Sequence, residues 1–440
     1  MSSSATFTNM RVYAADQFRL APSRTVANTS LYMTFGKVTS WANDSNPDIA
    51  NTSVATVNQI WQNMIGGKRL FSGDIVHVIP RFDWAANTKY IAYDHTNSNL
   101  YDGNTQFYIL TSEYNVYKCI SNANSSFSTV EPTAINPAAF SETSDGYVWK
   151  YMYSVSDGDQ LRFTTSQYMP VRALTSDDGS LQWQVQDQAI EGQIDSILLT
   201  NGGRNFTDPA NVSVTIAGDG ESASASATVN TVSNTISSIT VNDYGFGYSY
   251  ATVSISGGGG ADATARAIIS PSGGHGSDPI YELGASYAMV NGSLRNTEQG
   301  VFDISNDYRQ IALLIDPKKT DSNVSTNLTF AQTHTISTIG SGDYDLDEIV
   351  YQGGSFDTSF FNGKIVSWDS TNGVVKLINT TGSPTSQSLV GANSSTARFV
   401  TNIIEPELTR YSGQILYVNN ILPITRAADQ TEDFKIVIKF

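Results

Sequence analysis

Alternation of apolar and polar residues is the dominant pattern along this chain. Short runs rich in Val, Ile, Tyr, Phe and Thr end at Gly, Asn, Asp or Ser, which is typical of β-strands. In the run 433–440 every second residue from Phe434 to Phe440 is apolar, while Lys435 and Lys439 fall on the other face. We expect this last strand to form a sheet edge, where lysines limit uncontrolled pairing.

Residues 53–65 follow a helical period instead. Their apolar residues recur at steps of three and four positions, which places them on one helix face. Ser53 is suited to cap the start, and Gly66 with its neighbouring glycine is suited to end the helix. We predict a short helix that lies over a sheet with Trp61 as its anchor, and no other segment shows a comparable helical pattern.

An internal repeat lies within residues 191–270. Ile194–Ile197 matches Ile236–Ile239 at an offset of 42 residues, and Gly203 aligns with Gly245 at the same offset. Each copy ends in a Gly-rich turn followed by an Ala-rich run. Two copies are fewer than the roughly three that a stable solenoid needs. The pattern therefore predicts an inserted β-module of two repeats.

A second inserted β-module is predicted over residues 326–400. Its expected strands are Glu348–Gly353, Asn362–Asp369 and Gly373–Thr380. The Asn-Gly pairs at 362–363 and 372–373 are strong hairpin signals, because type I′ turns need a positive φ at both central residues. The polar tract 380–395 is expected to be a loop.

The segments outside the two modules are expected to form one discontinuous core. These segments are 1–190, 271–325 and 401–440. At about 100–200 residues per domain, a chain of this length holds two to four folding units. The predicted fold class is all-β, with a multi-domain β-sandwich-like core, two small inserted modules and one short helix.

Charge and composition exclude several classes of partner. The chain has 25 Lys and Arg against 41 Asp and Glu, a net charge of −16, so nucleic acid and anionic membranes are not expected partners. The start of the sequence resembles no secretory signal, and we expect synthesis in the cytoplasm. With Cys119 as the single cysteine, neither an intramolecular disulfide nor a cysteine-based zinc site is possible.

The candidate motifs for catalysis or cofactor binding each lack residues that the motif requires. The four histidines are His77, His95, His275 and His334, and no two have the spacing of metal ligands. The acidic run 343–348 resembles the start of a calcium loop, but Glu348 and Gly354 stand where the loop needs Gly and Glu. The glycines at 257–260 lack the lysine of a phosphate-binding loop. We expect no enzyme activity, cofactor, metal or small-molecule substrate.

A series of longer motifs follows a fixed order along the chain. They are Leu31–Gly36 with Trp41, Ile60–Met64, Val78–Trp84, Tyr117–Ile120, Asp145–Tyr151, Arg309–Ile311, Ser412–Tyr417 and Asp429–Phe440. Together they resemble the baseplate wedge subunit of T-even-like contractile-tailed bacteriophages, the gene-eight product family. The resemblance covers about the first 170 residues, the stretch near 300–317 and the last 30, and it leaves out both inserted modules.

This resemblance implies a structural protein of the viral tail baseplate that acts in virion assembly without catalysis. It also implies a homodimer that contacts the other wedge subunits, the products of genes six, seven and ten. The motif residues that become structural or interface candidates are Phe35, Gly36, Trp41, Trp61, Pro80, Arg81, Trp84, Gly146, Tyr147, Trp149, Arg309, Gln310, Gly413, Gln430 and Phe440.

A glycan-binding or glycan-cleaving phage tail protein is the alternative. Tyr147, Trp149, Tyr151 and Tyr153 lie on one face of a predicted strand, where they fill a core between sheets or stack on sugars. The core interpretation is favoured. Accessory sugar binding by the inserted modules stays open, because insertions often carry variable functions, and an acid pair for glycan cleavage is not identifiable from spacing.

Overall fold

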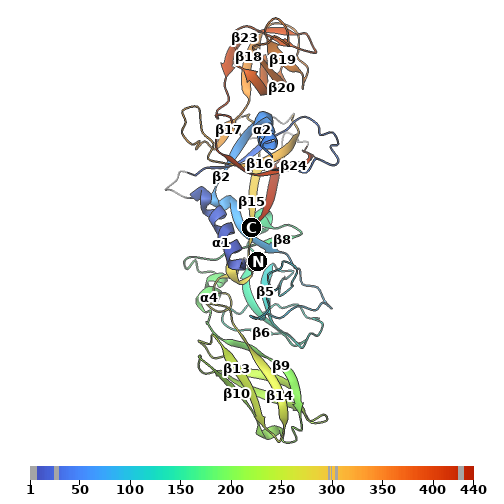
Figure 1. Ribbon diagram of the computed structural model, residues 1–440, viewed down its shortest axis with the longest axis vertical. Helices are drawn as coiled ribbons and strands as arrows, with labels where there is room; N and C mark the ends of the chain where they lie inside the picture. The colour runs from blue at the N-terminus through green and yellow to red at the C-terminus, as the bar shows by residue number, and fades with distance from the viewer. Residues whose placement is uncertain (1–6, 24–28, 296–297, 299, 303–305, 425–430) are drawn as a thin grey trace, which may run out of the picture. The chain divides into compact units, whose positions relative to one another are not determined.

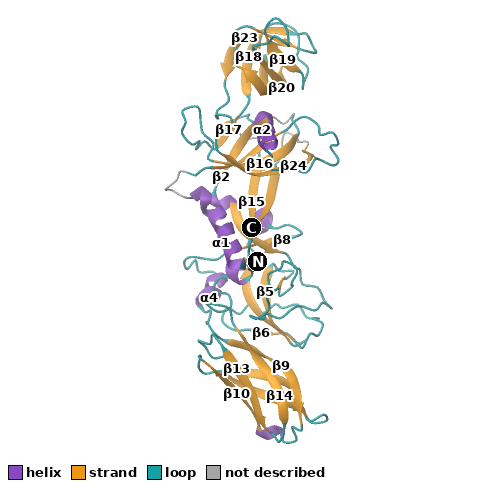
Figure 2. Cartoon of the chain, viewed as in Figure 1, coloured by secondary structure: helices purple, strands orange, loops and turns teal. Residues whose placement is uncertain are grey.

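Strands dominate the computed structural model, which describes residues 7–23, 29–295, 298, 300–302, 306–424 and 431–440 (Figures 1 and 2). The fold is all-β with several antiparallel sheets and a few short helices, which confirms the predicted class. Gln430 lies outside the described residues.

The helix predicted over residues 53–65 is present as α2 (Val54–Asn63), and the Ser53 side chain accepts a hydrogen bond from the Thr56 backbone at its start. The chain then passes directly into a strand that contains Gly66, so glycine does not end this helix.

The expectation of a single helix is wrong. The other helices are α1 (Thr8–Leu20), α3 (Asp157–Phe163), α4 (Leu181–Asp187) and α5 (Pro279–Glu282), with 3-10 turns η1 (Ala21–Ser23), η2 (Ser72–Asp74) and η3 (Pro209–Asn211). Three of the four are too short to display a helical period.

The described chain divides into two compact units. Unit 1 comprises the described residues of Met1–Asp16, Val76–Met289 and Val437–Phe440, and unit 2 those of Gln17–Ile75 and Val290–Ile436. The segments outside the inserted modules are thus shared between two units, which differs from the single discontinuous core expected. Single cores stop growing beyond about 250–300 residues, which favours such a division.

Unit 2 contains a five-stranded sheet with the strand order β17-β2-β1-β16-β24. Its strands are β1 (Leu31–Gly36), β2 (Met64–Leu70), β16 (Tyr308–Ile315), β17 (Thr329–Ala331) and β24 (Gln414–Ile424). All six residues of β1 are buried. Helix α2 packs Trp61 and Ile60 into a core with Tyr32 and Leu314, so Trp61 is the anchor that its position predicts.

The second predicted module contains a closed six-stranded barrel with the order β18-β21-β20-β19-β22-β23. Its strands are β18 (His334–Ile339), β19 (Ile349–Gln352), β20 (Phe361–Asp369), β21 (Val374–Gly382), β22 (Ser388–Gly391) and β23 (Ala397–Ile404). Asn372-Gly373 lies at a turn as predicted, but Asn362-Gly363 lies inside β20. A side chain at Gly363 would collide with Thr380 and Leu377, so close packing explains that glycine. Because β22 falls within 380–395, the expected loop is wrong.

The strands before and after the first module form two four-stranded sheets. One has the order β4-β5-β7-β6, formed by β4 (Tyr108–Leu110), β5 (Asn115–Asn122), β6 (Ser141–Glu142) and β7 (Tyr147–Ser154). The other has the order β25-β15-β3-β8, formed by β3 (Ile75–Pro80), β8 (Tyr168–Val171), β15 (Tyr287–Leu294) and β25 (Glu432–Lys439). Strand β25 ends the sheet order, and Phe434 and Ile436 are buried while Lys439 is exposed, as the alternation predicts.

The repeat folds into six strands, three from each copy. The first copy gives β9 (Ile194–Arg204), β10 (Val212–Gly218) and β11 (Ser224–Asn230), and the second gives β12 (Thr235–Asp243), β13 (Ala251–Gly257) and β14 (Ala261–Ile269). They form a four-stranded sheet, β10-β13-β14-β9, and a two-stranded one, β11-β12. The first strand of each copy therefore pairs with the last strand of the other.

The pairing between the two copies has local two-fold symmetry. In the central pair, Val214 lies opposite Ile255, its own counterpart in the repeat, and Val212 opposite Gly257 mirrors Ile216 opposite Val253. Two buried aromatic rings follow the same two-fold symmetry. Phe206 of the first copy covers Gly260 of the second, and Tyr248 of the second covers Gly220 of the first. Each copy completes the core of the other, so neither copy has a complete core alone.

This symmetry predicts equal effects at matched glycines. Gly203 and Gly245 have φ of 65° and 60°, and an added Cβ would lie 2.5 Å from the Ala261 carbonyl oxygen or 2.4 Å from that of Glu221. We expect Gly203→Ala and Gly245→Ala to lower the unfolding free energy by similar amounts, each above the roughly 1–2 kcal/mol of left-handed strain alone. Gly247→Ala is the control, because its φ is 76° but the nearest atom is 3.9 Å away. Denaturant unfolding would measure all three, and a large difference between the first two would contradict the symmetry.

Candidate functional site

The candidate residues taken from the motifs do not converge on one site. Those in unit 2 are Phe35, Gly36, Trp41, Trp61, Arg309, Gln310 and Gly413, and those in unit 1 are Pro80, Arg81, Trp84, Gly146, Tyr147, Trp149 and Phe440. Most of them hold the fold. Phe35 contacts Phe302, Tyr308 and Phe434 in the core of unit 2, and Gly413 lies in the turn before β24.

Three of the unit 2 candidates meet beside the edge strand β24. The Arg309 guanidinium donates to the Val38 carbonyl at 2.6 Å and to the Asp44 carboxylate at 3.1 Å. The Trp41 indole donates to the Ile421 carbonyl at 3.2 Å. These contacts fasten the loop 37–48 to the sheet, and the hydrogen bonds to Asp44 from Arg309 and the Trp41 backbone lower the pKa of that carboxyl.

Gln310 completes the attachment of this loop. Its side-chain amide donates to the Asn420 side chain at 2.8 Å, and Asn420 donates in turn to the Asp48 carbonyl at 2.9 Å. Strand β24 is the last strand of its sheet order and is eleven residues long. Leu416 and Leu422 are 46% and 56% exposed on it. A long edge strand with exposed leucines is suited to dock another protein.

The unit 1 candidates are mainly core and framework residues. Tyr147 and Trp149 are fully buried, and their rings stack with centroids 5.5 Å apart. The Trp84 indole donates to the Ser128 hydroxyl at 3.2 Å. The Gly146 position lies in the turn before β7, and the Phe440 backbone donates to the Ser286 carbonyl.

Pro80 and Arg81 hold the end of β3. The Pro80 carbonyl accepts a hydrogen bond from the Tyr108 hydroxyl at 2.9 Å. Arg81 pairs with Asp83 at 2.7 Å and donates to the Thr165 carbonyl at 3.1 Å. Both residues therefore order the loops at this sheet end.

The aromatic stripe of β7 is divided between two cores. Tyr147, Trp149 and Tyr151 belong to one buried cluster, whereas Tyr153 joins another with Met152. The pairing of β7 with β5 shifts register between Val116 and Tyr117, which fits this change of face. The core interpretation of the stripe accounts for these positions, since all four rings are at most 3% exposed.

A buried charged cluster of unit 1 was not anticipated from the sequence. The Lys118 ammonium lies 2.7 Å from the Glu282 carboxylate, and His275 lies between Glu282 at 3.0 Å and Asp195 at 2.7 Å. Each of these side chains is at most 3% exposed. The cluster joins β5, the first strand of the repeat module, the loop after β14 and α5. Nothing in the spacing of residues 118, 195, 275 and 282 marks them as neighbours.

Electrostatics within this cluster favour an ionised glutamate. Burial raises the pKa of Glu282, but Lys118 and His275 outweigh burial and bring that pKa down to about 2. The Gly276 backbone also donates to Glu282 at 2.6 Å. Burial lowers the pKa of Lys118, and the Glu282 carboxylate opposes that shift. These buried charge-assisted contacts link the four elements, so the cluster holds them together.

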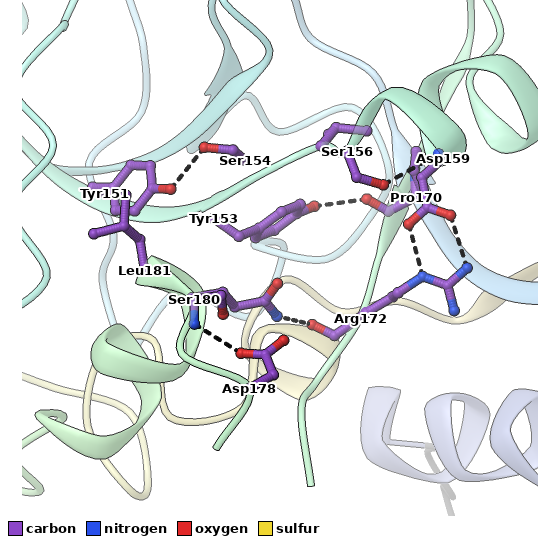
Figure 3. Close-up of a pocket in the computed structure, with 12 residues that line it drawn as sticks. Tyr151, Tyr153, Ser154, Ser156, Asp159, Pro170, Arg172, Asp178, Ser180 and Leu181 are labelled. Carbon is purple, nitrogen blue, oxygen red and sulfur yellow. Dashed lines mark hydrogen bonds and ion pairs between the residues drawn. The ribbon is translucent and has the colours of Figure 1, made fainter. Parts of the chain in front are cut away.

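A pocket of about 340 Å³ opens elsewhere in unit 1, beside the end of β7. Figure 3 shows its walls, which come from β7, α3, β8 and the start of α4. Arg172 makes a bidentate ion pair with Asp159 at 2.7 and 2.8 Å. The Tyr153 hydroxyl donates to the Pro170 carbonyl at 2.9 Å. This pocket was not predicted from the sequence, because its lining residues are scattered between Tyr151 and Gln182 with no motif spacing.

The acidic run 343–348 forms a turn held by hydrogen bonds within the run and from residues 393 and 394. The Glu348 carboxylate accepts from the Ser394 hydroxyl at 2.7 Å and from the backbones of Asn393 and Asp345 at 2.9 and 2.8 Å. Among the described residues, no group of three or more His, Cys, Asp or Glu is placed to hold a metal ion. The described helices also include none long and apolar enough to cross a membrane.

Comparison with known proteins adds no relative to this picture. No protein-family model matches the chain, and a search of curated proteins finds no match either. The baseplate resemblance therefore stays a prediction that rests on the sequence motifs.

Proposed function

We propose that this chain is a structural subunit of the baseplate wedge in a contractile phage tail, and that it acts by protein–protein assembly without catalysis. The ordered series of motifs supports the proposal, and the all-β fold agrees with what the resemblance implies. In this proposal the chain is a homodimer in the virion tail and contacts the other wedge subunits, the products of genes six, seven and ten.

The observation that carries the proposal is the arrangement at β24. Three candidate residues from separate motifs, Trp41, Arg309 and Gln310, attach the loop 37–48 beside one edge strand. The leucines of that strand remain exposed. Residues that serve assembly are expected to fix the shape of a docking edge, because a rigid surface loses little entropy on binding.

The proposal is tested by the masses of complexes. Native mass spectrometry or light scattering of the purified chain should give a dimer, and mixing with the other wedge subunits should give a larger complex. A strict monomer that joins none of these subunits would overturn the proposal, as would its absence from purified virus particles.

Leu416→Lys tests the docking edge itself. The change places a charge on an exposed strand edge, where it opposes pairing with another chain. We expect at least tenfold weaker association with the partner that uses this edge, and an unchanged circular dichroism spectrum. Leu161→Lys is the matched control, since Leu161 is 79% exposed on α3 of the other unit. If the two variants weaken association equally, β24 is not part of the interface.

Glycan cleavage gains no support from the aromatic stripe. Tyr147 and Trp149 are fully buried and stack on each other, so they offer no ring face to a sugar. A cell-wall hydrolysis assay on the purified chain tests the alternative directly, and activity abolished by a single Asp or Glu change would establish it.

A further inference from the structure

The pocket of unit 1 has the size and rigidity of a small-molecule site. Its volume of about 340 Å³ lies at the lower end of the roughly 300–1,000 Å³ typical of ligand pockets. Tyr151 and Tyr153 are almost fully buried residues of its lining, and hydrogen bonds to Ser154 and Pro170 fix both hydroxyls. This part of the lining is therefore held in one arrangement before any ligand arrives, which lowers the entropy lost on binding.

One wall of the pocket presents a pre-positioned cation. The Nε and Nη2 atoms of Arg172 bind the two oxygens of Asp159 (Figure 3). This leaves Nη1 without a partner in the described part of the chain. A guanidinium held in a fork keeps its remaining N–H donors in a fixed direction. The Phe163 ring lies 5.6 Å from the guanidinium and supports the same orientation.

The pocket also includes an exposed carboxylate. Asp178 accepts a hydrogen bond from the Ser180 backbone at 2.9 Å, and the hydrogen bonds from Ser180 lower the pKa of Asp178. It is therefore ionised at neutral pH and acts as an acceptor. Leu181, 43% exposed, adds an apolar contact to the lining.

These groups select a neutral ligand that both donates and accepts hydrogen bonds. Two carboxylates and one guanidinium give the lining a net negative charge, which disfavours an anion. The Arg172 charge disfavours a simple ammonium ion in the same space. A sugar ring carries hydroxyls that donate to Asp178 and accept from Arg172, and its C–H face suits Leu181. We propose that this pocket binds a residue of a neutral saccharide, a role that goes beyond assembly.

The test uses the full chain and defined probes. Methyl glycosides of glucose, galactose and N-acetylglucosamine are titrated by saturation-transfer NMR and calorimetry, with inorganic phosphate and methylammonium in parallel. We expect at least one glycoside to bind in the millimolar range or tighter and the two ions not to bind. Absence of glycoside binding at 50 mM, or binding of an ion alone, would overturn the proposal.

Two variants locate the binding. Asp178→Ala and Arg172→Lys should each weaken glycoside affinity at least tenfold, because the first removes an acceptor and the second replaces the planar guanidinium, with its fixed donor directions, by a single ammonium group. Asp187→Ala is the control, since Asp187 is an exposed residue of α4 outside the lining and its loss should leave affinity unchanged. Binding that survives both pocket variants would place the sugar elsewhere and refute the assignment. Wedge assembly is measured separately, so either proposal can fail alone.

Discussion

Glu282→Gln is expected to destabilise unit 1 by about 3–5 kcal/mol, the usual cost of removing one partner of a buried ion pair. The change leaves the Lys118 ammonium, which is fully buried, without its nearest counter-charge. The amide NH2 of the new glutamine must also face either the Gly276 N–H or the Lys118 ammonium, and both of these groups are hydrogen-bond donors. Calorimetry should show the transition of unit 1 falling by about 2–4 °C per kcal/mol.

Glu113→Gln provides the control, because it removes the same charge from an exposed position. Its melting temperature should stay within about 1–2 °C of the parent chain, as expected for a surface change within ±0.5 kcal/mol. The double variant Lys118→Met with Glu282→Gln should recover part of the loss, since no unpaired lysine charge then remains. If Glu282→Gln melts like the control, the cluster does not hold unit 1 together.

The pH dependence of stability follows from the same carboxylate. The pKa of Glu282 is about 2 in the folded chain against an ordinary value of 4.5. Its contribution is therefore complete above pH 4.5 and is lost as the pH falls toward 2. Glu282→Gln should flatten the part of the stability curve between these values.

Trp149→Ala is expected to cost about 3–5 kcal/mol, as for other large-to-small changes in a core. Trp149 is fully buried, stacks on Tyr147 and meets Tyr90 with ring centroids 5.6 Å apart. The variant loses these contacts and leaves a cavity. Denaturant unfolding followed by circular dichroism would measure the change.

Trp149→Phe separates packing from hydrogen bonding. The Trp149 indole N–H has no hydrogen-bond partner among the described residues, so phenylalanine loses no bond and keeps an aromatic ring in the stack. We expect a clearly smaller cost than for alanine. A Trp149→Ala chain that folds normally and only fails to bind a partner would instead assign this residue to an interface.

Much of the fold follows from local patterns. The alternation over 433–440 predicts a strand with Phe434 and Ile436 inside, and the structure has it. The period over 53–65 predicts α2, and Ser53 caps it. The offset of 42 residues predicts two copies of one unit. Such features depend on residues within a few positions of each other, or on direct self-similarity, and can be read without knowing any long-range contact.

The failures have equally physical causes. Helices α3 and α4 are seven residues each, less than the span over which a helical period is visible. Asn362-Gly363 has the sequence typical of a turn. Glycine is needed at position 363, however, because Thr380 and Leu377 pack against it and leave no room for a side chain. A local pattern does not distinguish a glycine required by backbone conformation from one required by a neighbour far away in sequence.

The sequence by itself determined that the chain is built of strands, where α2 lies and that residues 194–269 are duplicated. Only the tertiary structure decided that the two copies exchange strands, that Lys118, Asp195, His275 and Glu282 form one buried cluster, and that Arg172 and Asp178 line a shared pocket. The reason is that local structure depends on the preferences of adjacent residues. Sites depend on strand order and register, which bring together residues as far apart as Trp41 and Ile421, 380 positions along the chain.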